Sequence, residues 1–276
     1  MNYRSLFKIG SLFVDIIKKA MKLFGTLLIM LFFSSYSSCQ VVGDKEMSIT
    51  HLTGDFYIYT TYNFFDGIPF PSNSMYIVTD KGIVMLDTPW DPEFTRPLVD
   101  SIEKVHNKKV IMCLATHFHD DRTAGLEILR KRGVKTYSTS MTKRLCKERN
   151  EKQAEYVINR DTTFNFGNHS FSTYYPGAGH SPDNIVVWFD KEKILYGGCI
   201  IKSTESEKLG NIVDANITAW MKSIKDLMKR YSNAVYIIPG HFGWEDTRSM
   251  KHTLKLLEIE DKNPIKGLVQ DKPYQN

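Results

Sequence analysis

Short strand-like apolar runs and amphipathic helical segments alternate along the chain. Strand-like runs occur at 47–52, 55–61, 75–79, 82–87, 109–116, 134–139, 162–166, 170–175, 184–189, 193–198 and 234–238. Helical patterns occupy 91–105, 124–133, 140–152, 218–231 and 249–260. Runs such as 109–116 contain few polar positions, which is typical of strands that are covered on both faces. The pattern therefore predicts an α/β fold, in which helices cover the sheets of one domain with two layered halves.

Local signals indicate the start of one helix, the end of another and a hairpin. Asp91 and Pro92 are suited to the first turn of the helix at 91–105, and Gly133 is suited to end the helix at 124–133. The stretch 60–73 is rich in turn residues and has an aromatic tip. We predict a hairpin there, with a tip too apolar for an ordinary solvated loop.

The composition is sufficient for a large hydrophobic core, and the charge balance argues against a nucleic-acid partner. With 42% hydrophobic and 12% aromatic residues, the chain of 276 residues can fill a large core. The formal net charge is +5, but five of the 36 basic residues and one of the 31 acidic residues precede residue 40. The remaining 31 basic and 30 acidic residues nearly cancel. We therefore predict no nucleic-acid partner.

The first 39 residues have the pattern of a secretory signal. Three lysines precede the apolar run at 23–33, and small residues follow at 34–40. We predict a signal segment at 1–39, in which 1–20 is an upstream extension if Met21 is the true start, and a mature domain at 40–276. Two alternatives stay open: simple cleavage near Cys39, or a lipid anchor on Cys39. Both place the mature protein in the periplasm, the second on a membrane.

The cysteine count argues against a disulfide framework. If Cys39 is removed or lipidated, the odd set of Cys113, Cys146 and Cys199 remains. Cys113 lies within a strand pattern and Cys146 within a helix pattern, so both are expected to fill the core. Cys199 follows a strand directly, and its thiol is the one that we expect to have a chemical role.

The stretch "CLATHFHDDRTAG" at 113–125 carries the first chemical signal. In an extended segment alternate residues point to one side, so His117, His119 and Asp121 would converge on one place. Such a triplet predicts a metal site at the end of a buried strand. The alternative is a capped turn before a helix, in which Asp120 or Asp121 accepts hydrogen bonds from the helix amides.

Three more metal-binding side chains adjoin apolar runs in the same manner. His180 lies in "PGAGHSPDN", Cys199 in "ILYGGC" and His241 in "YIIPGHFG". Strand ends gather along one sheet edge, where sites on α/β scaffolds form. Three histidines with an open position are typical of catalytic zinc, which also tolerates the mixed O, S and N ligands of a second site. Two such ions can hold a bridging hydroxide at neutral pH.

The segments "THFHDDR", "GAGHSPDN", "GGC" and "PGH", in this order and spacing, resemble the class B metallo-β-lactamases, and most closely their first subclass. The resemblance extends over about residues 47–260 and implies a four-layer αββα sandwich. It implies two Zn²⁺ ions per chain, one bound by His117, His119 and His180 and the other by Asp121, Cys199 and His241. It further implies a monomer that hydrolyses the β-lactam amide of penicillins, cephalosporins and carbapenems with a metal-bound hydroxide, which confers antibiotic resistance.

The resemblance also implies roles around the metals. Asp121, Lys202 and Asn211 would take part in catalysis, and Lys202 and Asn211 would also bind the substrate carboxylate and the β-lactam carbonyl. Asp87 would support the metal loop. A mobile flap over the substrate would have an apolar tip made of Phe64, Phe65 and Ile68. The alternatives are a solvated lysine at 202, a turn residue at 211 and phenylalanines folded into the core.

Three positions beside the site depart from the commonest family pattern or vary within it. Ala124 and Phe242 stand where glycine is common, which affects the expected pocket shape, and Arg122 places a cation beside Asp121. Two rival functions are a thioesterase of the same fold and a non-catalytic metal-binding domain. Such thioesterases carry histidine after the motif aspartate and aspartate as the bridging ligand, where this chain has Arg122 and Cys199. An intact lysine–asparagine pair argues against the second rival.

Overall fold

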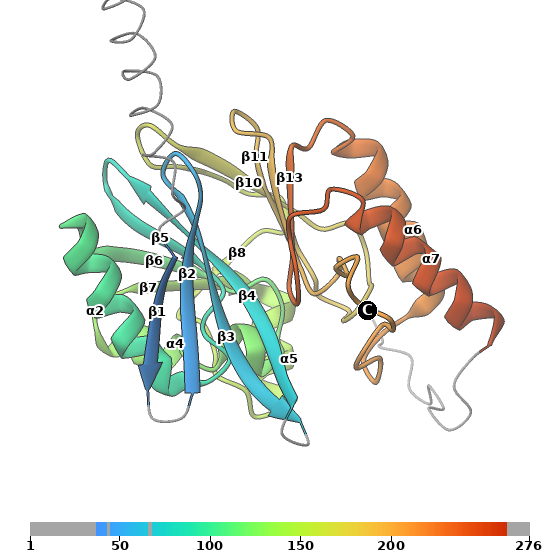
Figure 1. Cartoon of the computed structure of the whole chain (residues 1–276), viewed down its shortest axis with the longest axis horizontal. Helices are drawn as coiled ribbons and strands as arrows, with labels where there is room; N and C mark the ends of the chain where they lie inside the picture. Colours follow the sequence, from blue (N-terminus) through green and yellow to red (C-terminus); the bar gives the residue numbers. More distant parts are fainter. Residues whose placement is uncertain (1–36, 43–44, 66–67, 264–276) are drawn as a thin grey trace, which may run out of the picture. The chain divides into compact units, whose positions relative to one another are not determined.

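Four layers make up the fold, with two sheets stacked between two layers of helices (Figure 1). The computed structural model describes residues 37–42, 45–65 and 68–263. The predicted signal segment lies outside these residues except for 37–39, which begin the first strand. Within the described part of the chain, no helix is long and apolar enough to cross a membrane.

In both sheets, neighbouring strands are consecutive in the sequence. The first contains β1 (Ser37–Val42), β2 (Lys45–Thr53), β3 (Phe56–Phe65), β4 (Ile68–Thr79), β5 (Gly82–Leu86), β6 (Val110–Leu114), β7 (Lys135–Thr139) and β8 (Tyr156–Ile158). Its pairs are antiparallel from β2 to β5 and parallel from β5 to β8. The second, in the order β13-β12-β11-β10-β9, contains β9 (Thr163–Asn165), β10 (Ser170–Tyr174), β11 (Val186–Phe189), β12 (Ile194–Gly198) and β13 (Tyr236–Pro239).

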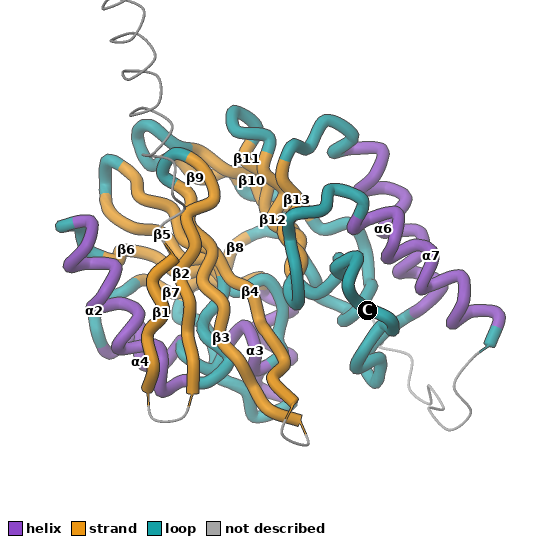
Figure 2. The backbone as a smooth tube through the Cα atoms, viewed as in Figure 1, coloured by secondary structure: helices purple, strands orange, loops and turns teal. Residues whose placement is uncertain are grey.

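Helices cover the outer face of each sheet (Figure 2). The 3₁₀ turn η1 (Pro92–Phe94), α2 (Thr95–His106) and α4 (Leu126–Lys131) pack on the first sheet, and α6 (Ile217–Arg230) and α7 (Ser249–Lys262) pack on the second. A third apolar cluster fills the space between the sheets. The remaining short helices are α3 (Asp120–Thr123) and α5 (Ser140–Glu148). This arrangement confirms the predicted αββα sandwich.

The local signals predict the helix ends well. The Asp91 carboxylate accepts a hydrogen bond from the Glu93 amide at 2.9 Å, and Pro92 begins the helical turn, as predicted. Gly133, after α4, has a φ of 80°, which glycine adopts without a steric penalty. The predicted helix at 140–152 is shorter in the structure, because α5 ends at Glu148.

The main differences from the prediction lie in the strands. The predicted hairpin is a continuous antiparallel ribbon, in which β3 and β4 pair from Phe56 with Ile77 to Phe65 with Ile68. The predicted strands at 55–61 and 75–79 cover only the base of this ribbon. Strand β8 was not predicted, because its three residues, two of them exposed, have too few positions to show a pattern.

Candidate metal centre

Four loops at one edge of the two sheets carry the predicted metal ligands. His117 and His119 follow β6, Cys199 directly follows β12 and His241 lies two residues after β13, whereas His180 lies between β10 and β11. The loop before β11 is joined to the first sheet, because the Ile185 amide donates to the Thr116 carbonyl at 3.0 Å. Strand ends from both sheets therefore meet here, as the sequence predicts.

Three imidazoles converge on one point. His117 Nε2 lies 3.1 Å from His119 Nδ1, and His119 Nδ1 lies 3.1 Å from His180 Nε2. The rings of all three pairs are nearly perpendicular, so the nitrogens and not the ring faces approach each other. Burial lowers the pKa of both His117 and His180 well below its ordinary value, which keeps their nitrogens neutral and able to bind a metal.

A second group of ligands adjoins the first. Asp121 Oδ2 lies 3.2 Å from Cys199 Sγ and 3.1 Å from His241 Nε2, and the Cys199 and His241 atoms are 3.3 Å apart. Asp121 Oδ1 lies 3.8 Å from His117 Nε2, which joins the two groups. Burial raises the pKa of the Cys199 thiol well above its usual range. A bound divalent cation would deprotonate that thiol.

The two groups fit zinc. Nitrogens bound to one tetrahedral zinc at about 2.0–2.1 Å lie roughly 3.3 Å apart, close to the 3.1 Å separations in the histidine cluster. In the second group the ligand atoms of Asp121, Cys199 and His241 all lie within 4.8 Å of one another. Asp121 Oδ1 is buried without a hydrogen-bond partner, so an acceptor stays available there. The donor set of nitrogen, sulfur and oxygen is one that zinc accepts.

His117, His119 and Asp121 converge for a different reason than the predicted extended segment. Asp121 lies on the short helix α3 and not on an extended segment, and His119 is the residue before that helix. The alternative interpretation is correct in that a helix begins here. However, no side chain caps it, and the Asp121 carboxylate faces His241 and Cys199 instead.

Arg122 balances the charge beneath the second group. Its guanidinium is fully buried and lies 2.9 Å from Asp121 Oδ2 and 3.0 Å from Cys199 Sγ. It also donates to the carbonyl oxygens of Asn73 at 2.6 Å and Gly240 at 2.9 Å. Although burial opposes ionisation, the Arg122 guanidinium, the His241 hydrogen bond and the nearby histidines hold the pKa of Asp121 well below its usual range.

Two features of the loops support the metal groups, one beside each group. The Asp87 carboxylate accepts hydrogen bonds from the Thr116 amide at 2.7 Å and the Thr116 hydroxyl at 2.8 Å, directly before His117. This confirms the predicted support of the metal loop by Asp87. Gly240 is required beside the second group, because a Cβ there would lie 2.7 Å from Cys199 Sγ and 2.8 Å from the Arg122 guanidinium.

Lys202 is not the solvated lysine of the alternative interpretation. Only 7% of the residue is exposed, and its Nζ lies 5.4 Å from the centre of the Trp220 ring, which is itself 5.7 Å from His180. Burial lowers the pKa of Lys202. Its charge also affects both metal groups, because it helps to lower the pKa of His180 in the first group and of His241 in the second.

The flap residues and Asn211, the other predicted substrate contacts, differ from Lys202 in their exposure to solvent. Phe64 is 45% exposed and Ile68 is 68% exposed at the end of the β3–β4 ribbon, so they are not folded into the core. The Phe65 side chain is not among the described ones. Asn211 is exposed, and its side-chain oxygen accepts a hydrogen bond from the Val213 amide at 3.1 Å. That contact agrees with the alternative of a turn residue and leaves its substrate role a prediction.

The loop of Asn211 contributes a site residue that the sequence analysis missed. Asp214 Oδ2 lies 3.1 Å from His119 Nε2, and its other oxygen accepts from Arg149 at 2.7 Å. Burial lowers the pKa of His119, but the Asp214 hydrogen bond and nearby carboxylates outweigh that effect and raise it. Asp214 therefore fixes which nitrogen of His119 faces the other histidines. A carboxylate in a loop 95 positions away gives no local signal.

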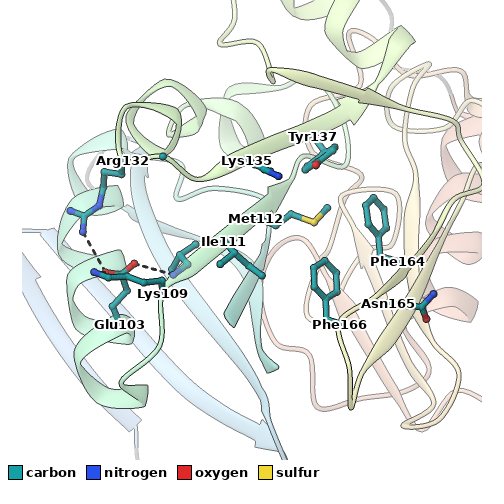
Figure 3. Close-up of a pocket in the computed structure, with 12 residues that line it drawn as sticks. Glu103, Lys109, Ile111, Met112, Arg132, Lys135, Tyr137, Phe164, Asn165 and Phe166 are labelled. Carbon is teal, nitrogen blue, oxygen red and sulfur yellow. Dashed lines mark hydrogen bonds and ion pairs between the residues drawn. The ribbon is translucent and has the colours of Figure 1, made fainter. Parts of the chain in front are cut away.

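A large cavity elsewhere is separate from this centre. It has a volume of about 700 Å³, and its lining includes Ile111, Met112, Phe164 and Phe166 (Figure 3). It lies near the first residues of β6 and β7, whereas the histidine cluster follows the last residue of β6. None of the predicted site residues lines it.

The comparisons with known proteins agree with this geometry. A sequence model of the Metallo-beta-lactamase superfamily matches residues 67–241. The chain belongs to this family. It is 44% identical to a metallo-beta-lactamase type 2 from Elizabethkingia meningoseptica over 77% of this chain and 85% of that protein. It is 37% identical to metallo-beta-lactamase IND-1 from Chryseobacterium indologenes over 87% of this chain and 98% of that protein.

A solved structure extends the likeness to three dimensions. The crystal structure of metallo-beta-lactamase IND-7 superposes with a TM-score of 0.75 at 39% identity, and the match covers 79% of this chain and 100% of that one. The chain is therefore a class B metallo-β-lactamase, a zinc-dependent hydrolase of the β-lactam ring. This membership confirms the resemblance that the metal-binding motifs carry and excludes the thioesterase and the non-catalytic rival.

Proposed function

We propose that this metallo-β-lactamase binds two zinc ions and opens the ring of penicillins, cephalosporins and carbapenems, and so confers resistance to them. The observation that carries the proposal is the contact between the two ligand groups. Asp121 belongs to the Asp-Cys-His group and lies 3.8 Å from a nitrogen of the three-histidine group. Two cations held by adjoining groups of this kind would be able to act together on one substrate amide.

Different residues would bind the metals, bind the substrate and cover it. His117, His119 and His180 would hold the first ion, and Asp121, Cys199 and His241 the second. When bound, zinc activates water as a nucleophile near pH 7 and stabilises negative charge on a leaving nitrogen. Lys202 binds the substrate carboxylate, and Asn211 donates to the β-lactam carbonyl oxygen. The apolar tip of the flap, with Phe64, Phe65 and Ile68, covers the substrate and excludes water.

Metal removal tests the proposal directly. Residues 40–276 are purified, and hydrolysis of a carbapenem and a chromogenic cephalosporin is followed with zinc, with a chelator, and after zinc is returned. We expect turnover that the chelator abolishes and zinc restores, together with about two zinc ions per chain by elemental analysis. Turnover that survives complete zinc removal, or full activity with one ion per chain, would contradict the proposed centre.

Lys202→Ala is expected to weaken substrate binding more than the chemical step. A charge-assisted hydrogen bond to a carboxylate contributes about 1.5–3 kcal/mol, so KM should rise about ten- to a hundredfold while kcat changes much less. Steady-state kinetics on a cephalosporin measures both constants. Lys208→Ala, which removes an exposed lysine from the following loop, is the matched control. An unchanged KM in the Lys202 variant would remove this residue from the binding site.

The first 39 residues concern where the enzyme acts. We propose that they direct the protein to the periplasm, where β-lactams meet their targets, and that the mature enzyme acts as a monomer. Either cleavage near Cys39 or lipidation of Cys39 would complete the process. Mass spectrometry of the mature N-terminus distinguishes the two, since a lipidated Cys39 carries the added mass of its acyl chains.

A further inference from the structure

Phe242, directly after the metal-binding His241, has a backbone conformation that suits glycine. Its φ is 61°, in the left-handed region. The other described residues with positive φ, glycines apart, are two asparagines, one aspartate and one lysine. For a residue with a Cβ this conformation is strained, because the Cβ lies too close to the following carbonyl oxygen. A bulky aromatic residue there needs an offsetting contact of its side chain.

The contact that Phe242 makes leads back to the metal centre. Its ring packs edge-on against Phe70 of β4, with the ring centres 4.8 Å apart. Phe70 also lies against the His241 imidazole, whose centre is 5.0 Å from the centre of the Phe70 ring. Trp90 closes the group, at 6.1 Å from Phe70 and 5.8 Å from His241. Phe70 thus contacts both the Phe242 ring and the metal-binding histidine.

Hydrogen bonds join the same two segments. His241 Nδ1 lies 2.8 Å from the Pro71 carbonyl oxygen, to which it donates, and this leaves Nε2 facing Asp121. The Asn73 side chain donates to the Phe242 carbonyl at 2.6 Å, and the Asn73 amide donates to the Gly240 carbonyl at 2.8 Å. Hydrogen bonds therefore join the first half of β4 to the loop after β13.

We propose that Phe242 is a positioning residue, which holds Phe70 against His241 and so couples the flap strand β4 to the second metal group. The proposal rests on the proposed function, in which His241 binds the second zinc. Without the Phe242 ring, Phe70 has room to turn away from the imidazole. His241 then keeps its hydrogen bond to Pro71 but loses the packing that restricts its orientation, and the second cation should bind more weakly.

Phe242→Gly separates this role from a purely structural one. Glycine adopts the left-handed conformation freely, so the variant loses the ring but also loses the backbone penalty. The midpoint of urea unfolding should stay close to that of the parent, while affinity for the second ion falls about tenfold, the lower end for a residue that supports a ligand. Phe242→Tyr keeps the ring and should bind the second ion like the parent.

Cobalt titration of the metal-free protein provides the readout. Binding at the second group produces a thiolate-to-cobalt absorption band from Cys199, whereas the three-histidine group has no sulfur. We expect the second dissociation constant to rise about tenfold in Phe242→Gly, and the first to stay unchanged. Tyr156→Ala, which removes an exposed aromatic ring from β8, should leave both constants unchanged.

Three different results would overturn the proposal. Parent-like second-ion affinity in Phe242→Gly, in protein that folds normally, would show that Phe242 does not position the histidine. A parent protein that binds cobalt without any thiolate band would instead show that the second metal group itself is wrong. In that case the assignment of His241 fails, and the coupling fails with it. Loss of second-ion affinity in Phe242→Tyr would also contradict a role for the ring.

Discussion

Arg122→Ala is expected to lower the free energy of unfolding of the zinc-free protein by about 3 kcal/mol. The guanidinium is fully buried and pairs with Asp121 at 2.9 Å and with Asp87 at 3.7 Å. Alanine would leave both carboxylates buried without their cation, and breaking a buried ion pair in this way costs roughly 3–5 kcal/mol. Urea denaturation in the presence of a chelator measures the change.

Zinc should recover part of this loss. A divalent cation bound by Asp121 and Cys199 replaces the missing positive charge, so the variant should gain more stability from zinc than the parent gains. Arg96→Ala, at an exposed position of α2, should change the free energy of unfolding by less than about 0.5 kcal/mol. A loss below 1 kcal/mol in the metal-free Arg122 variant would show that water or local rearrangement satisfies the two carboxylates.

The metal ligands could be predicted from the sequence because each follows a simple local rule. His117, Cys199 and His241 come directly after apolar runs, and the edge of an α/β sheet gathers such positions. The resemblance to the class B metallo-β-lactamases then assigns the ligands to two groups, because residue chemistry alone does not distinguish His241 from the other three histidines. The fold class follows from the same apolar runs, since strands covered on both faces require helices outside the sheets.

What could not be predicted depends on contacts between distant segments. Asp214 contacts His119 across 95 positions, and no pattern near Asp214 marks it. Arg122 appears in the sequence as a cation beside Asp121, but its contacts with Gly240 and Asn73 exist only when β4 and the loop after β13 meet. For Asn211 a local pattern is present but does not indicate a function. Its turn dipeptide explains the observed contact with the Val213 amide without any substrate role.

Asp121→Asn is expected to lower kcat/KM for a cephalosporin by about a hundred- to a thousandfold, or about 2.7–4 kcal/mol of transition-state stabilisation. The amide keeps the shape of the side chain but removes the negative charge that faces His241, Cys199 and Arg122. The second cation loses its anionic oxygen ligand, and the Arg122 guanidinium then repels it. Steady-state kinetics and zinc content by elemental analysis measure the two effects together.

The neighbouring aspartate gives a matched control for charge and sequence position. Asp120 is exposed on the same short helix, so Asp120→Asn should keep kcat/KM within about twofold of the parent. In Asp121→Asn the three-histidine group is intact, and we expect about one zinc ion per chain to remain. An Asp121 variant with parent-like turnover and two bound ions would show that the second ion does not need this carboxylate. Low turnover with two tightly bound ions would place the role of Asp121 in the chemical step, because occupancy alone could not then explain the loss.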